Sequence, residues 1–101
     1  MYKILLCCKS GLTTNMLVNA MKKEAKKRNI NTLIWAMAES AISHSWTDAD
    51  CVLVAPQNAG EIEDIKGIVN NTIPVDVIDS DNFVKMNGQA VLDQAINLVN
   101  K

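Results

Sequence analysis

The sequence predicts one α/β domain with a parallel sheet, because short apolar runs alternate with longer segments of helical periodicity. Four runs bounded by turn-forming residues are expected to be strands: 2–8, 32–37, 51–55 and 75–78. Apolar residues recur three and four positions apart in three further segments: 13–29, 61–71 and 88–99. This alternation favours a three-layer α/β/α fold, a four-stranded parallel sheet with helices on both faces, and right-handed crossovers favour the strand order 2-1-3-4.

The individual elements have local signals. The first strand is a continuous apolar run that Lys9, Ser10 and Gly11 end. Thr13 or Thr14 is expected to cap the helix that follows, whose inner face takes Met16, Leu17, Ala20, Met21 and Ala25. Pro56 ends the third strand and Pro74 opens the fourth, while residues 39–46 fit either a short helix or a turn.

Composition limits the classes of function. The chain has 101 residues, of which 49% are hydrophobic, and this suits a single domain over residues 1–101. A net charge of −1 gives no general attraction to nucleic acid or to anionic lipid. The first apolar run is too short to span a bilayer, and it is not arranged as a signal peptide. We therefore expect a cytoplasmic protein without membrane insertion.

The three cysteines, Cys7, Cys8 and Cys51, do not form a recognisable framework. An odd number with two adjacent members argues against disulfides, and a redox CxxC motif is absent. His44 is the only histidine, so we expect no metal site, and no cofactor motif is present. Cys7 and Cys51 are expected to be buried hydrophobic residues, whereas Cys8 borders a loop.

The loop after the first strand is the candidate site. In open α/β sheets, ligands bind at the carboxyl ends of the strands where connections diverge. Residues 9–14 (Lys9, Ser10, Gly11, Leu12, Thr13 and Thr14) fit a loop around a tetrahedral anion, with backbone amides, hydroxyls and a helix N-terminus as donors. The same position favours a thiolate, and Cys8 is the candidate nucleophile because the pleat turns Cys7 to the opposite face.

Several known site types are disfavoured by single residues. A cysteine phosphatase of the C-x5-R type needs arginine six positions after its nucleophile, where Cys8 has Thr14 and Cys7 has Thr13. A nucleotide-binding P-loop needs Gly-Lys-Ser/Thr at the helix start, which this loop lacks. A cysteine that takes a phosphoryl group without rapid hydrolysis fits best. A non-catalytic anion-binding regulatory module and a weak cysteine phosphatase stay as alternatives.

These segments resemble a known family, the IIB components of the lactose/cellobiose/chitobiose class of the phosphoenolpyruvate-dependent sugar phosphotransferase system. Residues 6–14 are similar to that family's strand and Cys-x-x-Gly-x-Ser/Thr-Ser/Thr loop. Residues 52–57, ending in Pro56 and Gln57, are similar to its third strand and Pro-Gln turn, and 75–79 to its fourth strand. The resemblance covers essentially the whole chain and implies a fold like that of low-molecular-weight tyrosine phosphatases.

The resemblance also implies a relay. Cys8 would accept a phosphoryl group from a phosphohistidine of a IIA partner and pass it to a sugar at the IIC membrane permease. The sugar would be a β-linked disaccharide such as cellobiose, chitobiose or lactose, and the domain, a monomer, would lie at the inner face of the membrane through IIC. Residues 9–14 would hold the phosphoryl oxygens, with Pro56 and Gln57 as a cleft border. Lys9 and the doubled cysteine depart from the family's pattern.

Other conspicuous residues have ordinary interpretations. His44 is expected on the surface, and Asp79 with Asp81 in an acidic turn or helix cap. Trp35 and Trp46 are expected to pack in or over the core. Leu12 fits either local packing or a contact surface for partners.

Overall fold

The computed structural model describes residues 1–8 and 11–100, with side chains given for all of these except 11–13 and 39. Within these residues four strands form one parallel sheet: β1 (Tyr2–Cys7), β2 (Thr32–Met37), β3 (Cys51–Val54) and β4 (Val75–Val77). The strand order is β2-β1-β3-β4, which confirms the predicted order. In register, Leu6 lies between Ala36 of β2 and Leu53 of β3, so β1 is central.

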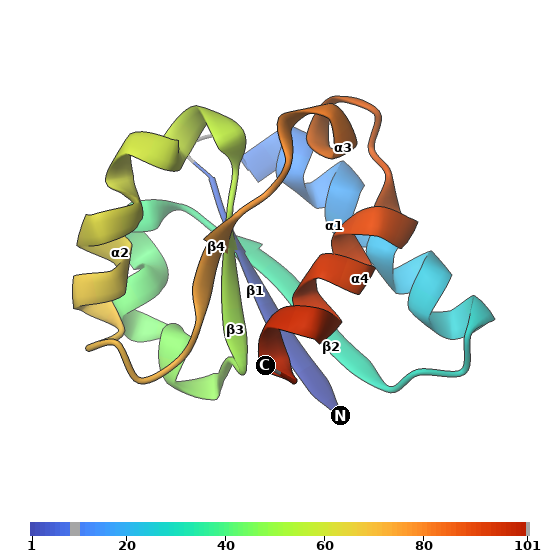
Figure 1. Cartoon of the computed structure of the whole chain (residues 1–101), viewed down its shortest axis with the longest axis horizontal. Helices are drawn as coiled ribbons and strands as arrows, with labels where there is room; N and C mark the ends of the chain where they lie inside the picture. The colour runs from blue at the N-terminus through green and yellow to red at the C-terminus, as the bar shows by residue number, and fades with distance from the viewer. Residues whose placement is uncertain (9–10, 101) are drawn as a thin grey trace.

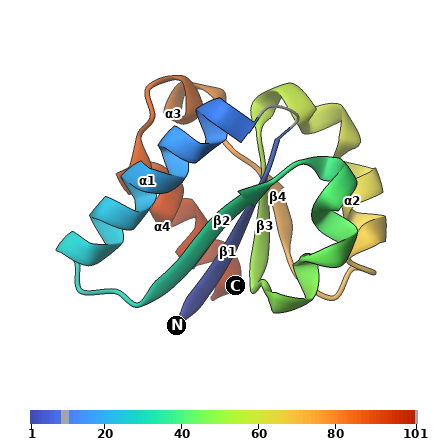
Figure 2. The same cartoon turned by 180° about the vertical axis from the view of Figure 1, so that it is seen from behind.

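Helices cover both faces of this sheet. The described helices are α1 (Gly11–Lys27), α2 (Ile62–Ile68), α3 (Ser80–Val84) and α4 (Gly88–Val99). Short 3-10 segments are η1 (Glu39–His44), η2 (Trp46–Asp48) and η3 (Pro56–Glu61). Figure 1 shows α1 and α4 on one side of the sheet and α2 on the other. Seen from behind in Figure 2, the segment between β2 and β3 lies on the α2 side.

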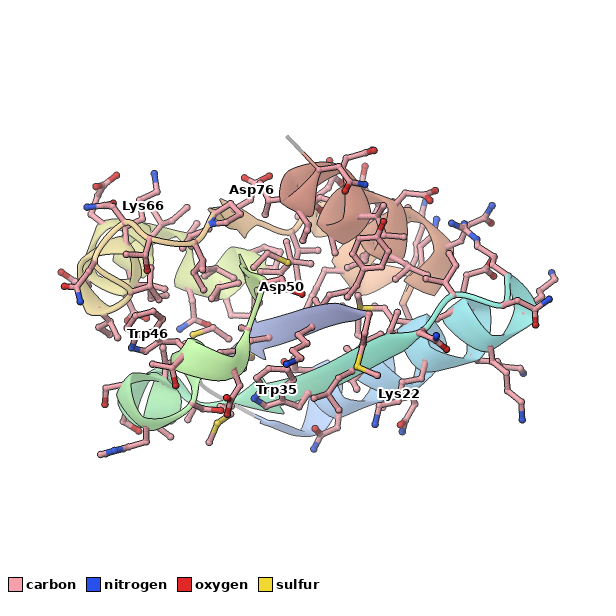
Figure 3. All side chains as sticks on the ribbon, turned by 90° about the horizontal axis from the view of Figure 1, so that it is seen from below. Lys22, Trp35, Trp46, Asp50, Lys66 and Asp76 are labelled. Atoms are coloured by element: carbon pink, nitrogen blue, oxygen red, sulfur yellow. The ribbon has the colours of Figure 1, made fainter. Side chains whose placement is uncertain are left out.

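The two faces of the sheet have separate apolar cores. The strand pleat sends alternate residues to opposite sides, and both sides of β1 and β3 are buried, which explains their continuous apolar runs. Cys8 belongs to the core under α1 and α4, which contains Ile4, Leu6, Leu17, Met21, Cys51, Leu53, Leu92 and Ala95. Cys7 belongs to the core under α2, which contains Leu5, Ile42, Val52, Val54, Ile65 and Val69. In Figure 3, Lys66 on α2 and Lys22 on α1 lie at opposite sides of the molecule.

The first helix differs from the prediction at both ends. It begins at Gly11 rather than at a threonine cap, and it ends at Lys27. Asn29 takes the left-handed conformation (φ 57°), and Ile30 N–H donates to the carbonyl of Ala25, which closes the helix two residues early. Met16 is 58% exposed, so its predicted inward place was wrong. The buried stripe is centred on Leu17 and Met21 and takes in Thr14 and Val18 instead, which leaves Met16 on the solvent side.

The second half of the chain has shorter elements than the periodicity predicts. The helix expected over 61–71 ends at Ile68, because Asn70 and Asn71 both have positive φ. The fourth strand ends at Val77, although Ile78 N–H still donates to the carbonyl of Val54 at 2.8 Å. Helix α3 was not predicted, since five residues are too few for a periodic pattern.

Candidate functional site

Cys8 lies at the carboxyl end of the central strand. Its N–H donates to the carbonyl of Met37 at the end of β2, 3.2 Å away, and the carbonyl of Cys7 accepts from Ala55 N–H just after β3 at 2.9 Å. The connection from β1 crosses one face of the sheet to β2, and the one from β2 returns over the other face to β3. Cys8 therefore occupies the switch point where ligands bind in such sheets.

The sulfur of Cys8 has a polar partner from the next strand along the sheet. Gln57 Nε2 donates to Cys8 Sγ at 3.3 Å. Pro56 opens η3 directly after β3, and this places Gln57 over the end of β1. The predicted cleft border at Pro56 and Gln57 thus lies next to the candidate nucleophile, and Gln57 touches its reactive atom.

Asn58 and Glu61 position this segment through a hydrogen bond that the sequence analysis did not predict. Asn58 is 1% exposed, and its Nδ2 donates to Glu61 Oε2 at 2.8 Å. The Asn58 N–H also donates to the carbonyl of Ala55 at 2.9 Å. A buried amide that bonds within its own turn holds the backbone of η3 in place. The side chain of Gln57 is exposed while its backbone is held.

The N-terminus of α1 follows the candidate loop. A helix of 17 residues presents unsatisfied N–H groups and a partial positive charge at this end, and its first turn has no acidic residue. Thr14 lies in that turn with 0% exposure, and among the described residues its Oγ1 has no hydrogen-bond partner. A buried hydroxyl without a partner is costly, so a ligand that accepts from it would be stabilised.

The predicted phosphate-binding residues 9–14 fall into two groups. Lys9 and Ser10 lie outside the described residues. Gly11, Leu12, Thr13 and Thr14 form the first turn of α1, and of their side chains the structure describes that of Thr14. The assignment of residues 9–14 to phosphoryl oxygens stays a prediction.

The other two cysteines are buried, as expected. Cys7 and Cys51 both have 0% exposure. Burial, together with the adjacent Asp50 carboxylate, raises the pKa of the Cys51 thiol from 9.0 to about 12. Cys51 is therefore protonated at neutral pH, and Cys7 faces the core opposite to that of Cys8.

The other conspicuous residues of the sequence lie on the surface, cap a helix or pack against a core. His44 is exposed at the end of η1, and Asp79 caps α3 by accepting from the N–H groups of Asp81 and Asn82. Trp35 and Trp46 pack against the α2-side core, and Trp35 Nε1 donates to Ser45 Oγ at 2.9 Å. Figure 3 shows both rings on this side of the sheet.

Among the side chains that the structure describes in residues 1–8 and 11–100, no three from His, Cys, Asp or Glu are placed to hold a metal ion together. In the same residues, no helix combines the length and apolar character that crossing a membrane requires. An open groove of about 530 Å³ is lined by Lys22, Lys26 and 29–34, at the far end of α1 from Cys8.

Known proteins are similar in sequence to this chain over nearly its full length. The family described as lactose/cellobiose-specific IIB subunits of the PTS matches residues 3–94. The oligo-beta-mannoside-specific EIIB component of Bacillus subtilis (strain 168) is 32% identical over 100 residues, which are 98% of this chain and 97% of the relative. The galactose-specific EIIB component of Lactococcus lactis subsp. cremoris is 31% identical, over 96% of this chain and 95% of its own.

Solved structures agree in fold. The solution structure of a cellobiose-specific phosphotransferase IIB component from Borrelia burgdorferi has a TM-score of 0.83 and 39% identity, over 98% of this chain and 92% of its own. The lactose-specific IIB domain from Streptococcus pneumoniae has a TM-score of 0.85 at 17% identity, covers 96% of both chains and supports the fold alone. The chain therefore belongs to the lactose/cellobiose-specific IIB subunits of the sugar phosphotransferase system, a family of phosphotransferases.

Proposed function

We propose that Cys8 is a phosphoryl carrier, which accepts a phosphoryl group from a phosphohistidine of a IIA protein and transfers it to a sugar at a IIC permease. The observation that carries this proposal is the place of the Cys8 sulfur. It lies at the switch point of the sheet beside the N-terminus of α1 and accepts an N–H from Gln57 at 3.3 Å. Partial positive charges from both sources lie where negative charge gathers on the sulfur and the phosphoryl oxygens during transfer.

Each transfer step balances without a cofactor. In the first, the sulfur supplies an electron pair to phosphorus while the N–P bond of phosphohistidine breaks and its pair stays on the imidazole nitrogen. The proton lost by the thiol is matched by the one that the imidazole regains. In the second, a sugar hydroxyl forms the O–P bond and gives up its proton, and the S–P bond breaks to restore the thiol. Donor, acceptor and phosphorus must lie in line, so both partners are needed.

The position of Arg28 supports a carrier over a phosphatase. Rapid hydrolysis of a phosphocysteine needs a guanidinium at the phosphoryl oxygens, and the C-x5-R position holds Thr14. Arg28, the only arginine, follows the far end of α1, where it binds Asp93 Oδ1 at 2.6 Å and Glu24 Oε2 at 2.7 Å. These carboxylates raise the pKa of its guanidinium and hold it away from Cys8. The phosphocysteine should therefore persist until an acceptor arrives.

The names of the relatives support a class of acceptor sugar. Those at about 31–32% identity are named for oligo-beta-mannosides, galactose and cellobiose. We propose a β-linked disaccharide of the cellobiose, chitobiose or lactose type as the acceptor, held by IIC. The domain acts as a monomer at the inner face of the membrane, which it meets through IIC.

Intact-mass spectrometry tests the proposal. Wild type, Cys8→Ser and Cys7→Ser are incubated with phosphoenolpyruvate, the general phosphotransferase proteins and a cognate IIA. We expect one added phosphoryl group on wild type and on Cys7→Ser, and none on Cys8→Ser. Phosphorylation retained in Cys8→Ser would show that another residue accepts the phosphoryl group.

Two further outcomes separate the carrier from the other functions considered for this site. If a phosphorylated IIA transfers nothing to wild type, the chain is a binding module rather than a carrier. Steady hydrolysis of an aryl phosphate by the isolated domain would identify a phosphatase. Both outcomes contradict the relay.

A further inference from the structure

The Cys8 sulfur is covered in the unphosphorylated protein. Cys8 is 1% exposed, although it lies at the edge of the sheet where ligands bind. A phosphorus atom that forms a bond to sulfur must approach that atom directly, so a covering group has to move. Of the described side chains, Gln57 makes a polar contact with Sγ from a surface position.

Gln57 combines a fixed backbone with a free side chain. Its backbone belongs to η3, which the Asn58–Glu61 hydrogen bond and the contact from Asn58 N–H to Ala55 hold in place. Its side chain is exposed and can change rotamer without disturbing a core. The same amide can therefore lie on the sulfur or turn outward while the segment keeps its place.

We propose that Gln57 is a positioning residue that covers and orients the Cys8 sulfur before transfer, and swings aside as the phosphoryl group arrives. The amide N–H that donates to sulfur in the free protein then donates to a phosphoryl oxygen of phosphocysteine. A phosphoryl oxygen is a stronger acceptor than a thiol sulfur, so the exchange favours the phosphorylated form. This inference rests on Cys8 as the acceptor, and it adds a role in transfer for Gln57.

Three variants separate cover from hydrogen bonding. Gln57→Ala removes both the cover and the donor. Gln57→Met keeps a side chain of similar length but has no N–H, and Gln57→Asn keeps the N–H but is one methylene shorter. Gln89→Ala is the matched control, because Gln89 is an exposed glutamine near the start of α4.

Alkylation of Cys8 by iodoacetamide measures the cover without any partner protein. The rate is compared at alkaline pH, where it no longer depends on pH, and peptide mapping assigns the modified cysteine. We expect Gln57→Ala to react about fivefold faster than wild type, because the side chain that covers the sulfur is gone and the barrier to attack is lower. Gln57→Met and Gln89→Ala should react at the wild-type rate. A Gln57→Ala alkylation rate equal to that of the wild type would overturn the proposal that Gln57 covers the sulfur.

Phosphorylation rates and NMR signals test the second part of the proposal, that the Gln57 amide donates to the phosphoryl group. With phosphorylated IIA, Gln57→Met and Gln57→Ala should be phosphorylated about fivefold more slowly than wild type, and Gln57→Asn should recover part of the loss. In the wild type, the side-chain amide NMR signals of Gln57 should move on phosphorylation. Those of Gln94, which donates to Asp76 and to the Val77 carbonyl, should stay in place.

The two proposals fail in different ways. Gln57 amide signals that do not move when Cys8 is phosphorylated would overturn the swing and leave the carrier intact. No phosphorylation of any variant would remove the carrier, while the alkylation rates would still test the contact between Gln57 and Cys8.

Discussion

Neighbouring residues of this chain differ in chemistry because of the atoms around them. Cys7 and Cys8 are adjacent, yet one lies in the α2-side core and the other beside Gln57. Two threonines also differ in whether their hydroxyl has a partner. Thr72 Oγ1 donates to the Val69 carbonyl at 2.6 Å. Thr14 Oγ1 is buried without a partner among the described residues. The described fold thus leaves this one buried hydroxyl unsatisfied, so it is available to a ligand that accepts a hydrogen bond.

Replacement of Thr14 tests whether its hydroxyl is kept for a ligand. Thr14→Val removes a buried, unpartnered hydroxyl at nearly constant volume, so the free energy of unfolding should rise by about 1 kcal/mol. The same variant should be phosphorylated more slowly, since it offers one donor fewer. Urea denaturation and the phosphorylation assay measure the two effects.

Thr72→Val is the opposite control. It loses a made hydrogen bond, so its stability should fall by about 1 kcal/mol while phosphorylation is unchanged. A Thr14→Val protein that is less stable than wild type would show that the hydroxyl has a structural partner.

At the scale of elements, α1 and α4 approach each other at a glycine. A Cβ built on Gly88 would lie 2.5 Å from the Ala20 carbonyl carbon and 2.8 Å from the Met21 nitrogen. These are backbone atoms of α1, and they cannot move without the helix. The contact fixes how α4 lies over α1, the helix whose first turn adjoins Cys8.

Alanine should lower the free energy of unfolding at Gly88 but not at Gly67. Gly88→Ala forces α4 away from α1 and should lower the free energy of unfolding by about 1–3 kcal/mol. Gly67→Ala in α2 meets no atom within 4 Å and has an ordinary φ, so it should be neutral or raise stability by up to about 1 kcal/mol. Urea midpoints at constant slope measure both. Equal effects would mean that helix propensity, not the close approach, decides the outcome.

Element prediction succeeded where an apolar run or a helical period is present and failed where neither is. Strands β1 and β3 were predictable because burial of both faces makes them largely apolar, whereas β2, in which Leu33 is 49% exposed, was indicated by a short apolar run after turn-forming residues. Helix α3 was missed because five residues capped by Asp79 carry no period. Met16 was misplaced because one step along a helix turns a side chain by about 100°, enough to leave the buried stripe.

For the whole molecule, one sheet joins two cores. Both tryptophans pack against the α2-side core, whereas Leu92 of α4 lies in the other with 0% exposure. Since β1 and β3 contribute residues to both cores, damage to one should weaken the entire domain. The domain is therefore expected to unfold in a single step.

Leu92→Ala tests this coupling. The cavity should lower the free energy of unfolding by about 2–5 kcal/mol. Tryptophan fluorescence and far-UV circular dichroism should report the same lower urea midpoint. A circular dichroism transition that precedes the fluorescence transition would show that the two layers unfold separately.

The site illustrates the limit of sequence reasoning at this scale. The place of Cys8 at the carboxyl end of the first strand was predictable from the apolar run before it and the glycine-containing loop after it. Its contact with Gln57 joins residues 49 positions apart, and it depends on the strand order and on one side-chain rotamer. The sequence supports Gln57 as a neighbour of the cleft but contains no signal for the bond to sulfur. The hydrogen bond between Asn58 and Glu61 had no signal in the sequence, because it forms only in the folded turn.

The spacing of the three cysteines has a consequence for oxidative stress. Cys51 lies opposite Ile4 in the sheet, so Cys8 is four residues further along, about 13 Å away, whereas a disulfide needs Cα atoms within about 7 Å. Cys7 is adjacent, but its side chain occupies the other core. An oxidised Cys8 therefore has no resolving thiol within its own fold. Only a thiol from another molecule, such as a small cellular thiol, can reduce it, so recovery from oxidation depends on the surrounding cell rather than on this protein.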